Sequence, residues 1–172
     1  MPDGSRRSAV TQEFRPGPGS ERAYRDALGA FATGVTIVTC RDDQWPLAIT
    51  ANSFASISLD PPLVMWSPAV SSSRHDSFVA APRFAIHVLA ADQLTLGRRF
   101  ALDGRAFDGT DWEEGDGLPM LPCLARFDCR HHAAHGAGDH TIVLGQVERV
   151  VQGEGAPLVF CQGAYGRFAN ED

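Results

Sequence analysis

Small polar side chains gather in one segment of an otherwise apolar stretch. Thr50, Asn52, Ser53, Ser56 and Ser58 are interspersed with small or apolar residues. Hydroxyl and amide groups on a strand that leaves a sheet offer hydrogen-bond donors and acceptors with little bulk, which suits a planar heteroaromatic ligand with several ring nitrogens and carbonyls. The alternative interpretation is a strand that ends in an Asn/Ser turn.

A second polar cluster, residues 67–74, lies between an expected strand and an expected helix. Hydroxyls and backbone N–H groups at a helix N-terminus, with the guanidinium of Arg74 beside them, favour a phosphate or another anion. The simpler interpretation is that Ser73 caps the helix, with Asp76 three positions later as in a capping box. The two interpretations are compatible.

Four of the six histidines fall within residues 131–140. Imidazoles and the carboxylate of Asp139 are good ligands for zinc or iron. His131 and His132, however, are neighbours on an expected strand and therefore point to opposite faces. No C-x-x-C or H-E-x-x-H spacing accompanies them, and a hairpin turn at 136–139 explains the segment, so we expect no metal site.

The composition excludes several other chemistries. All fifteen basic residues are arginine, so neither a G-x-x-x-x-G-K-[ST] phosphate loop nor a lysine Schiff base is available. The G-x-G-x-x-G fingerprint and the G-x-S-x-G nucleophile elbow are also missing. A net charge of −6 is the opposite of the basic footprint that nucleic-acid binding needs, so no nucleic acid is expected as a partner.

The elements that must position these clusters follow from the pattern of apolar residues. Alternating or β-branched runs predict strands over 35–40, in a run from Pro46 through Leu59 that Pro61-Pro62 stops, and over 63–66, 83–90, 123–130, 141–151 and 157–161. A polar turn at 41–44 makes a hairpin of the first two. Many strands with mostly short connections indicate a mainly β protein, an antiparallel barrel or sandwich.

A few peripheral helices complete the predicted fold. Helical spacing predicts one helix that Ser20 caps and Gly34 ends, and two more over 75–81 and 92–102. Residues 103–122 are predicted to be a long polar loop. The length of 172 residues and the hydrophobic content of 44% predict one domain over 20–172.

The N-terminal residues 1–19 are rich in Gly, Pro, Ser and Arg, which predicts a disordered tail. We find neither a run of about eighteen apolar residues nor a hydrophobic signal region. The four cysteines lie in a chain long enough to fold without disulfides, so we expect reduced thiols. These observations predict a cytoplasmic protein with no membrane partner.

Four segments, in this order along the chain, resemble the short-chain flavin reductases, the small NAD(P)H:flavin oxidoreductases that supply two-component flavin monooxygenases. They are residues 31–39, residues 50–54 with their continuation over 58–64, residues 138–140, and residues 163–165. The resemblance covers roughly residues 22 to 168. It implies a split β-barrel that works as a homodimer, with FMN or FAD in a groove on the barrel and the partner subunit nearby.

The resemblance also implies which residues bind the two nucleotides. For the flavin they are Pro46, Leu47, Ala48, Ile49, Thr50, Asn52 and Ser53 along the isoalloxazine ring, Ser67, Pro68, Ala69, Ser73 and Arg74 at the ribityl and phosphate groups, and Arg99 and Phe100 at a further contact. For the nicotinamide of NADH or NADPH they are Gly138, Asp139, His140 and Tyr165. We expect His140 to act by orienting the nicotinamide nucleotide through a hydrogen bond, because hydride transfer needs no general base. The alternative is a histidine that holds its hairpin to a neighbour.

The implied reaction is hydride transfer from C4 of the nicotinamide to N5 of the flavin, and the reduced flavin then serves a partner monooxygenase. The cofactors carry the redox chemistry, while the protein holds two flat rings in contact and donates hydrogen bonds toward the flavin N1 and C2=O. Two nucleotides on one small domain must share a groove. One competing reading is a non-enzymatic FMN-binding electron carrier, and another is a metal-binding protein built on the histidine cluster.

Overall fold

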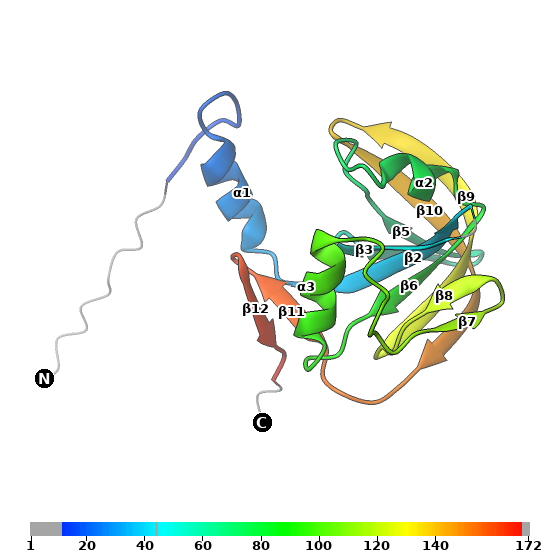
Figure 1. The fold of residues 1–172 in the computed structure, drawn as a ribbon. Coiled ribbons are helices and arrows are strands. Elements are labelled where there is room, and N and C mark those ends of the chain that lie inside the picture. The colour runs from blue at the N-terminus through cyan, green and yellow to red at the C-terminus, as the bar shows by residue number, and fades with distance from the viewer. Residues whose placement is uncertain (1–11, 44, 170–172) are drawn as a thin grey trace, which may run out of the picture.

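The computed structural model describes residues 12–43 and 45–169. The strands are β1 (Thr33–Gly34), β2 (Thr36–Asp42), β3 (Trp45–Ala51), β4 (Ala55–Leu59), β5 (Pro62–Trp66), β6 (Arg83–Val88), β7 (Glu113–Gly115), β8 (Leu118–Met120), β9 (Ala125–Ala137), β10 (His140–Gln152), β11 (Leu158–Cys161) and β12 (Ala164–Arg167). The helices are α1 (Glu21–Gly29), α2 (His75–Ala80) and α3 (Leu94–Leu102). Seven strands form one antiparallel sheet in the order β3-β2-β6-β9-β10-β5-β4, beside the small sheets β1-β11-β12 and β7-β8 (Figure 1).

The large sheet curls because its two edge strands are joined by a very short link. β3 ends at Ala51 and β4 begins at Ala55, so only residues 52–54 connect the opposite edges of the sheet. The two edges must therefore approach each other at this end, which produces the open barrel seen in Figure 1. The predicted mainly β split barrel with peripheral helices is confirmed.

Two apolar clusters hold the barrel together. Inside it, the Trp66 ring packs edge-on against Phe78 of α2, with ring centroids 5.1 Å apart, and lies beside Phe84. Between the sheet, α3 and β11 lies the second cluster, which includes Ile37, Phe100 and Leu158. Because β2 separates the two clusters, residues 35–40 are buried on both faces. This position explains why the strand is an unbroken run of apolar and β-branched residues instead of an alternating one.

The structure corrects the predicted end of the first helix. α1 ends at Gly29, and Gly34 belongs to β1, whose two residues pair with Phe160 and Val159 of β11. Gln162 N–H donates to the carbonyl of Gly29 at 2.8 Å. This bond to the C-terminal hairpin takes the place of the hydrogen bond that would continue the helix beyond Gly29. Ser20 occupies the predicted N-cap position, although within the described residues its side chain makes no hydrogen bond to the helix.

The predicted long loop 103–122 contains a hairpin, β7-β8. Leu118 and Met120 alternate with Pro119 and are buried beside Ala85, and Thr39 donates a hydrogen bond to the carbonyl of Pro119 at 2.7 Å. The strand β12 was also missed. Ala164 and Gly166 are of types depleted in strands, and pairing with β11 decides the conformation of this four-residue segment.

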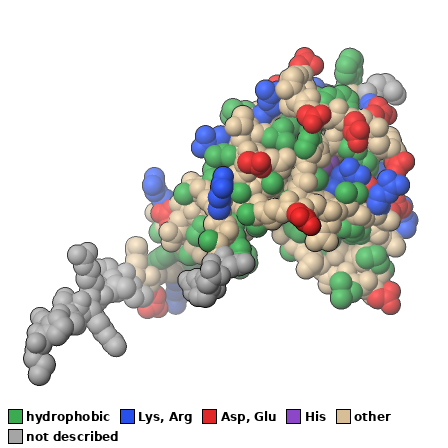
Figure 2. Space-filling view, turned by 90° about the horizontal axis from the view of Figure 1, so that it is seen from below, with side chains coloured by type: hydrophobic (Ala, Val, Ile, Leu, Met, Phe, Trp, Pro, Cys, Tyr) green, Lys and Arg blue, Asp and Glu red, His purple; other side chains and the backbone are tan. Residues whose placement is uncertain are grey.

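Surface charges are mixed. Figure 2 shows Arg, Asp and Glu side chains interspersed over the face seen from below. Residues 1–11 of the predicted disordered tail lie outside the described residues, and residues 12–19 form no helix or strand. In the described part of the chain, no helix has the length and hydropathy needed to cross a membrane.

Candidate functional site

The outer edge of β3 faces α3 and the loop that follows it. Ala48 N–H donates to the carbonyl of Gly104 at 2.9 Å, and its own carbonyl accepts a hydrogen bond from Arg74 at 3.2 Å. Two residues along, Thr50 Oγ1 donates to the carbonyl of Gly97 at 2.7 Å. Alternate residues of a strand direct their backbone groups to the same edge, so the N–H and C=O of Thr50 point outward as well.

The side chains of the predicted flavin segment are mostly in the core. Leu47 and Ile49 pack inside the barrel, and Ala48 packs between the sheet and α3. Pro46 is half-buried. The outward backbone groups of Ala48 are bonded to Gly104 and Arg74, so a ligand along this strand would find polar groups from Thr50 onward.

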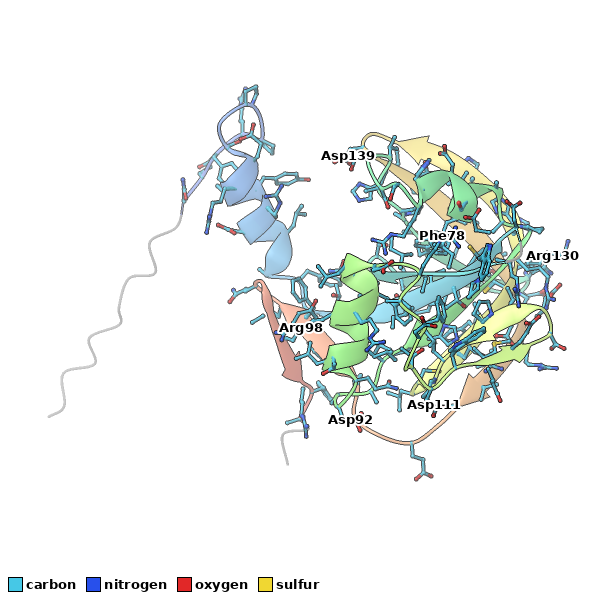
Figure 3. All side chains as sticks on the ribbon, in the orientation of Figure 1. Phe78, Asp92, Arg98, Asp111, Arg130 and Asp139 are labelled. Atoms are coloured by element: carbon cyan, nitrogen blue, oxygen red, sulfur yellow. The ribbon has the colours of Figure 1, made fainter. Side chains whose placement is uncertain are left out.

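A cavity of about 170 Å³ opens where β3 ends. Thr50 and Asn52 line one side of it, and Phe160 and Tyr165 line another. The Phe160 and Tyr165 rings pack with centroids 5.0 Å apart, and the guanidinium carbon of Arg98 lies 5.8 Å from the Tyr165 ring centre. Figure 3 shows Arg98 on the side of α3 that faces β12. The structure thus brings Tyr165, predicted at the nicotinamide, next to residues predicted at the flavin.

Asn52 and Ser53 form the rim of this region. The Asn52 side-chain amide donates to Thr33 Oγ1 at 3.3 Å. The Ser53 hydroxyl accepts the N–H of Ser67 at 2.9 Å. The link between the barrel edges is therefore held to the end of β5, where the predicted ribityl-binding segment begins.

The segment after β5 runs beside the start of β10. Thr141 N–H donates to the carbonyl of Pro68 at 3.1 Å, and Val70 N–H donates to the carbonyl of Asp139 at 2.9 Å. Ala69 and His140 form an antiparallel bridge between these bonds. Pro68 and Ala69 are thereby brought together with the predicted nicotinamide turn, in which Gly138 adopts φ 69°.

His140 and its neighbours form a polar group at the tip of the β9-β10 hairpin, where Figure 3 labels Asp139. His140 Nδ1 lies 2.8 Å from Asp139 Oδ1, and the hydrogen bond from His140 is the main reason why the pKa of Asp139 is below its ordinary value. His75 Nε2 lies 2.8 Å from Thr141 Oγ1, which ties α2 to this hairpin. His140 keeps 45% of its side chain exposed, so the imidazole is accessible to a ligand.

Arg74, expected at the phosphate, and Arg99, expected at a further flavin contact, both donate to backbone carbonyls. Arg74 reaches the carbonyls of Ala48, Phe100 and Ala101, and burial lowers its pKa. Arg99 reaches the carbonyls of Ala106 and Asp108, at 3.3 and 2.8 Å. The Phe100 side chain is fully buried against Phe107, so only its backbone could contact a ligand.

The N-terminus of α2 differs from the predicted cap. Arg74, not Ser73, occupies the N-cap position, and the described residues place no side-chain hydrogen bond there. Ser72 Oγ accepts the N–H of Arg74 at 3.2 Å, and Ser73 is exposed. Ser73 and Arg74 line a cavity of about 280 Å³ together with Asp42, Asp103 and Arg105.

The four predicted nicotinamide residues lie in two places within one protomer. Tyr165 lines the cavity at the end of β3. Asp139 and His140 line a separate cavity of about 670 Å³, whose other wall is α1 with Tyr24, Arg25 and Leu28.

Gly104, His75 and Thr141 were missed from the sequence, because a glycine in a loop and a histidine–threonine pair 66 residues apart carry no local pattern.

The histidine cluster and the cysteines give little support to metal binding or to thiolate catalysis. Among the described residues, no group of three or more His, Cys, Asp or Glu side chains is placed to hold a metal ion. Burial raises the pKa of the Cys40 and Cys129 thiols to about 12 and that of Cys123 to about 11, which disfavours a thiolate nucleophile.

Comparison with known proteins agrees with this architecture. The model of the flavin reductase like domain matches residues 28–169. The FMN reductase (NADH) SmoA of Agrobacterium fabrum is 58% identical over 160 residues, which cover 92% of each chain. The reductase component of the flavin-dependent trigonelline monooxygenase of Acinetobacter baylyi is 44% identical over 84% of this chain, which spans only 48% of that longer protein.

Solved structures give the same result. The NADH:FAD oxidoreductase SgcE6 of Streptomyces globisporus, in complex with NAD and FAD fragments, superposes with a TM-score of 0.81 at 37% identity, over 87% of this chain and 94% of that one. Fold, sequence and matched length agree, and the chain belongs to the flavin reductase-like family.

Proposed function

We propose that this protein is an NADH-dependent flavin reductase that transfers a hydride to FMN or FAD and supplies the reduced flavin to a partner monooxygenase. The observation that carries the proposal is the polar rim of Thr50, Asn52 and Ser53 beside the Tyr165 cavity, on a flavin-reductase barrel. The relative at 58% identity, an FMN reductase that uses NADH, favours FMN and NADH as the substrates.

The donor set fits a flavin. Flavin, when bound, supplies the hydride acceptor at N5. We assign the pyrimidine edge of its ring to the outward N–H and C=O of Thr50 and to the amide of Asn52, which together can donate and accept as that edge requires. The Ser53–Ser67 pair holds this rim in place, and the ring of Tyr165 with the guanidinium of Arg98 provides a flat surface beside it.

The nicotinamide nucleotide is assigned to the side of the groove that carries the β9-β10 hairpin. Its turn exposes Gly138 and Asp139 and half-exposes His140, and the hairpin lies directly against Pro68 and Ala69. His140 is proposed to orient the nucleotide through a hydrogen bond to its carboxamide or pyrophosphate. A fixed orientation favours hydride transfer because both rings must lie in contact.

We also propose that the protein is a homodimer. Tyr24, Leu28 and Phe31 are spaced four and three residues apart, and they are 46%, 57% and 79% exposed. Tyr24 and Leu28 lie on one face of α1 and Phe31 follows its end, so the three form an apolar stripe. The helix projects from the barrel in Figure 1 and buries none of its residues. A nine-residue helix is marginally stable without packing. A second copy that covered this stripe would stabilise α1, which lines the cavity that contains Asp139 and His140.

The experiment that tests the function is a steady-state assay of NADH oxidation with FMN, FAD or no added flavin, repeated with NADPH. We expect oxidation that depends on added flavin and is faster with NADH than with NADPH. A tightly held flavin without NADH oxidation would instead support an electron carrier. The cytoplasmic location expected from the sequence remains a prediction.

A further inference from the structure

One guanidinium joins three elements at the predicted flavin groove. Arg74, which precedes α2, donates to the carbonyls of Phe100 at 2.7 Å and Ala101 at 3.2 Å in the last turn of α3. The same side chain donates at 3.2 Å to the carbonyl of Ala48 on the outer edge of β3. Three of its five N–H groups are thus used within the protein.

These carbonyls are ones that need a partner. The last four C=O groups of a helix receive no hydrogen bond from an N–H group of the same helix. The partial negative charge at this end of the helix favours a cation. An edge strand likewise presents unpaired carbonyls on its outer side. Arg74 satisfies both kinds at once, and its partial burial lowers the pKa of the guanidinium.

Gly104 completes the same junction. Its carbonyl accepts the N–H of Ala48 at 2.9 Å. A Cβ atom at Gly104 would lie 2.6 Å from Cδ of Arg74 and 2.7 Å from the carbonyl oxygen of Ala48, both too close for a side chain. Only glycine lets the loop after α3 approach β3 while the Arg74 side chain passes beside it.

We propose that Arg74 is a positioning residue that clamps α3 against the edge of β3 and so sets the width of the flavin groove, instead of binding the flavin phosphate. The inference rests on the proposed function, since it assigns a role within that groove. The forked guanidinium of Arg74 explains why this residue is an arginine. A guanidinium can donate to three carbonyls in different directions, whereas the ammonium of a lysine is a compact point charge.

The test compares FMN with riboflavin, which has the same ring and no phosphate. For Arg74→Ala we expect the KM of both flavins to rise by the same factor, about fivefold or more, with their ratio unchanged. Arg74→Lys should behave like Arg74→Ala. Lysine keeps the positive charge but lacks the forked guanidinium, and the clamp depends on the fork. A KM increase at least about tenfold larger for FMN than for riboflavin, or rescue of FMN binding by lysine, would overturn the proposal.

A second variant breaks the clamp with Arg74 in place. Gly104→Ala should raise the KM for both flavins equally, whereas Gly136→Ala, where a Cβ meets nothing within 4 Å, should leave both unchanged. Thermal unfolding identifies variants that fail to fold.

A readout that does not depend on catalysis separates this proposal from the proposed function. Hydrogen exchange of the Ala48 amide, measured without flavin, should be faster in Arg74→Ala and Gly104→Ala than in the wild type. Unchanged exchange at Ala48 refutes the clamp even if flavin reduction is confirmed. Absence of NADH oxidation by the wild type refutes the reductase and leaves the exchange result valid.

Discussion

Ser53 and Ser67 hydrogen-bond to each other in both directions. The hydroxyl of Ser53 accepts the backbone N–H of Ser67 at 2.9 Å and donates to the carbonyl of Ser67 at 3.3 Å. Ser53 lies on the three-residue link between the edges of the large sheet, and Ser67 follows β5. One side chain therefore joins the two segments that we assign to the ring and to the ribityl chain of the flavin.

Ser53→Ala should weaken flavin binding and stability together. It leaves the Ser67 N–H without its partner, which costs about 1 kcal/mol in the free energy of unfolding, and it frees the rim that orients the flavin. We expect the flavin KM to rise about fivefold. Ser56→Ala, at an exposed position of β4, is the matched control. Equal kinetics for the two variants would argue against a role for Ser53.

His140→Ala should affect the nicotinamide and spare the flavin. Loss of one hydrogen bond of about 1 kcal/mol predicts an NADH KM about fivefold higher, or a lower kcat, with unchanged FMN affinity. His135→Ala removes an exposed imidazole from the same hairpin and serves as the control. If the two variants match, His140 only holds its hairpin and does not contact the nucleotide.

His87 should make stability depend on pH in the acidic range. It is fully buried, Nδ1 lies 3.1 Å from the carbonyl of Ile37, and Nε2 accepts the N–H of Leu121 at 3.2 Å. Burial, the largest cause, lowers its pKa from 6.5 to about 4. Because the folded pKa lies below the unfolded one, the stabilisation is complete above pH 6.5 and is lost as pH falls toward 4.

The loss attributable to His87 is on the order of 3 kcal/mol across this window. Urea unfolding at a series of pH values measures it. His87→Gln should flatten the dependence between pH 6.5 and about 4, although it lowers stability at neutral pH. A variant that keeps the wild-type slope would show that other groups cause it.

Leu28→Glu should dissociate the proposed dimer. A carboxylate in the centre of the apolar stripe Tyr24, Leu28 and Phe31 would have to be buried without a partner if a second copy covered it. Light scattering on eluted protein should give a dimer for the wild type and a monomer for the variant. Asp26→Asn lies on the other side of α1 and should remain dimeric; a monomeric wild type would refute the assignment.

The sequence was sufficient to predict the barrel strands, but not the end of α1 or the β7-β8 hairpin. Strands such as residues 35–40 are predictable because burial selects apolar and β-branched residues along them. The end of α1 was predicted five residues late, because hydrogen bonding to the C-terminal hairpin decides it. β7-β8 escaped prediction because a three-residue strand shows too little periodicity.

The site was predictable to a similar degree. Thr50, Asn52 and Ser53 stood out as polar residues at a strand end; Thr50 and Asn52 line the cavity where β3 ends, and Ser53 bonds to Ser67, while their contact with a flavin stays a prediction. The protein acceptors of Arg74 and Arg99 could not be inferred from the sequence. Arg74 donates to carbonyls of residues 48, 100 and 101, and Arg99 donates to carbonyls of the loop that follows α3, and neither set of contacts leaves a local pattern. Only the folded arrangement distinguishes a ligand contact from an internal clamp.

The most direct test of the central claim is anaerobic mixing of the protein with NADH and FMN while the visible absorbance of oxidised FMN is followed. Hydride transfer predicts that one FMN is bleached for each NADH consumed, at a rate proportional to protein concentration, and that air restores the colour. If FMN stays oxidised with both NADH and NADPH at rates no higher than without protein, the account of this chain as a flavin reductase is contradicted.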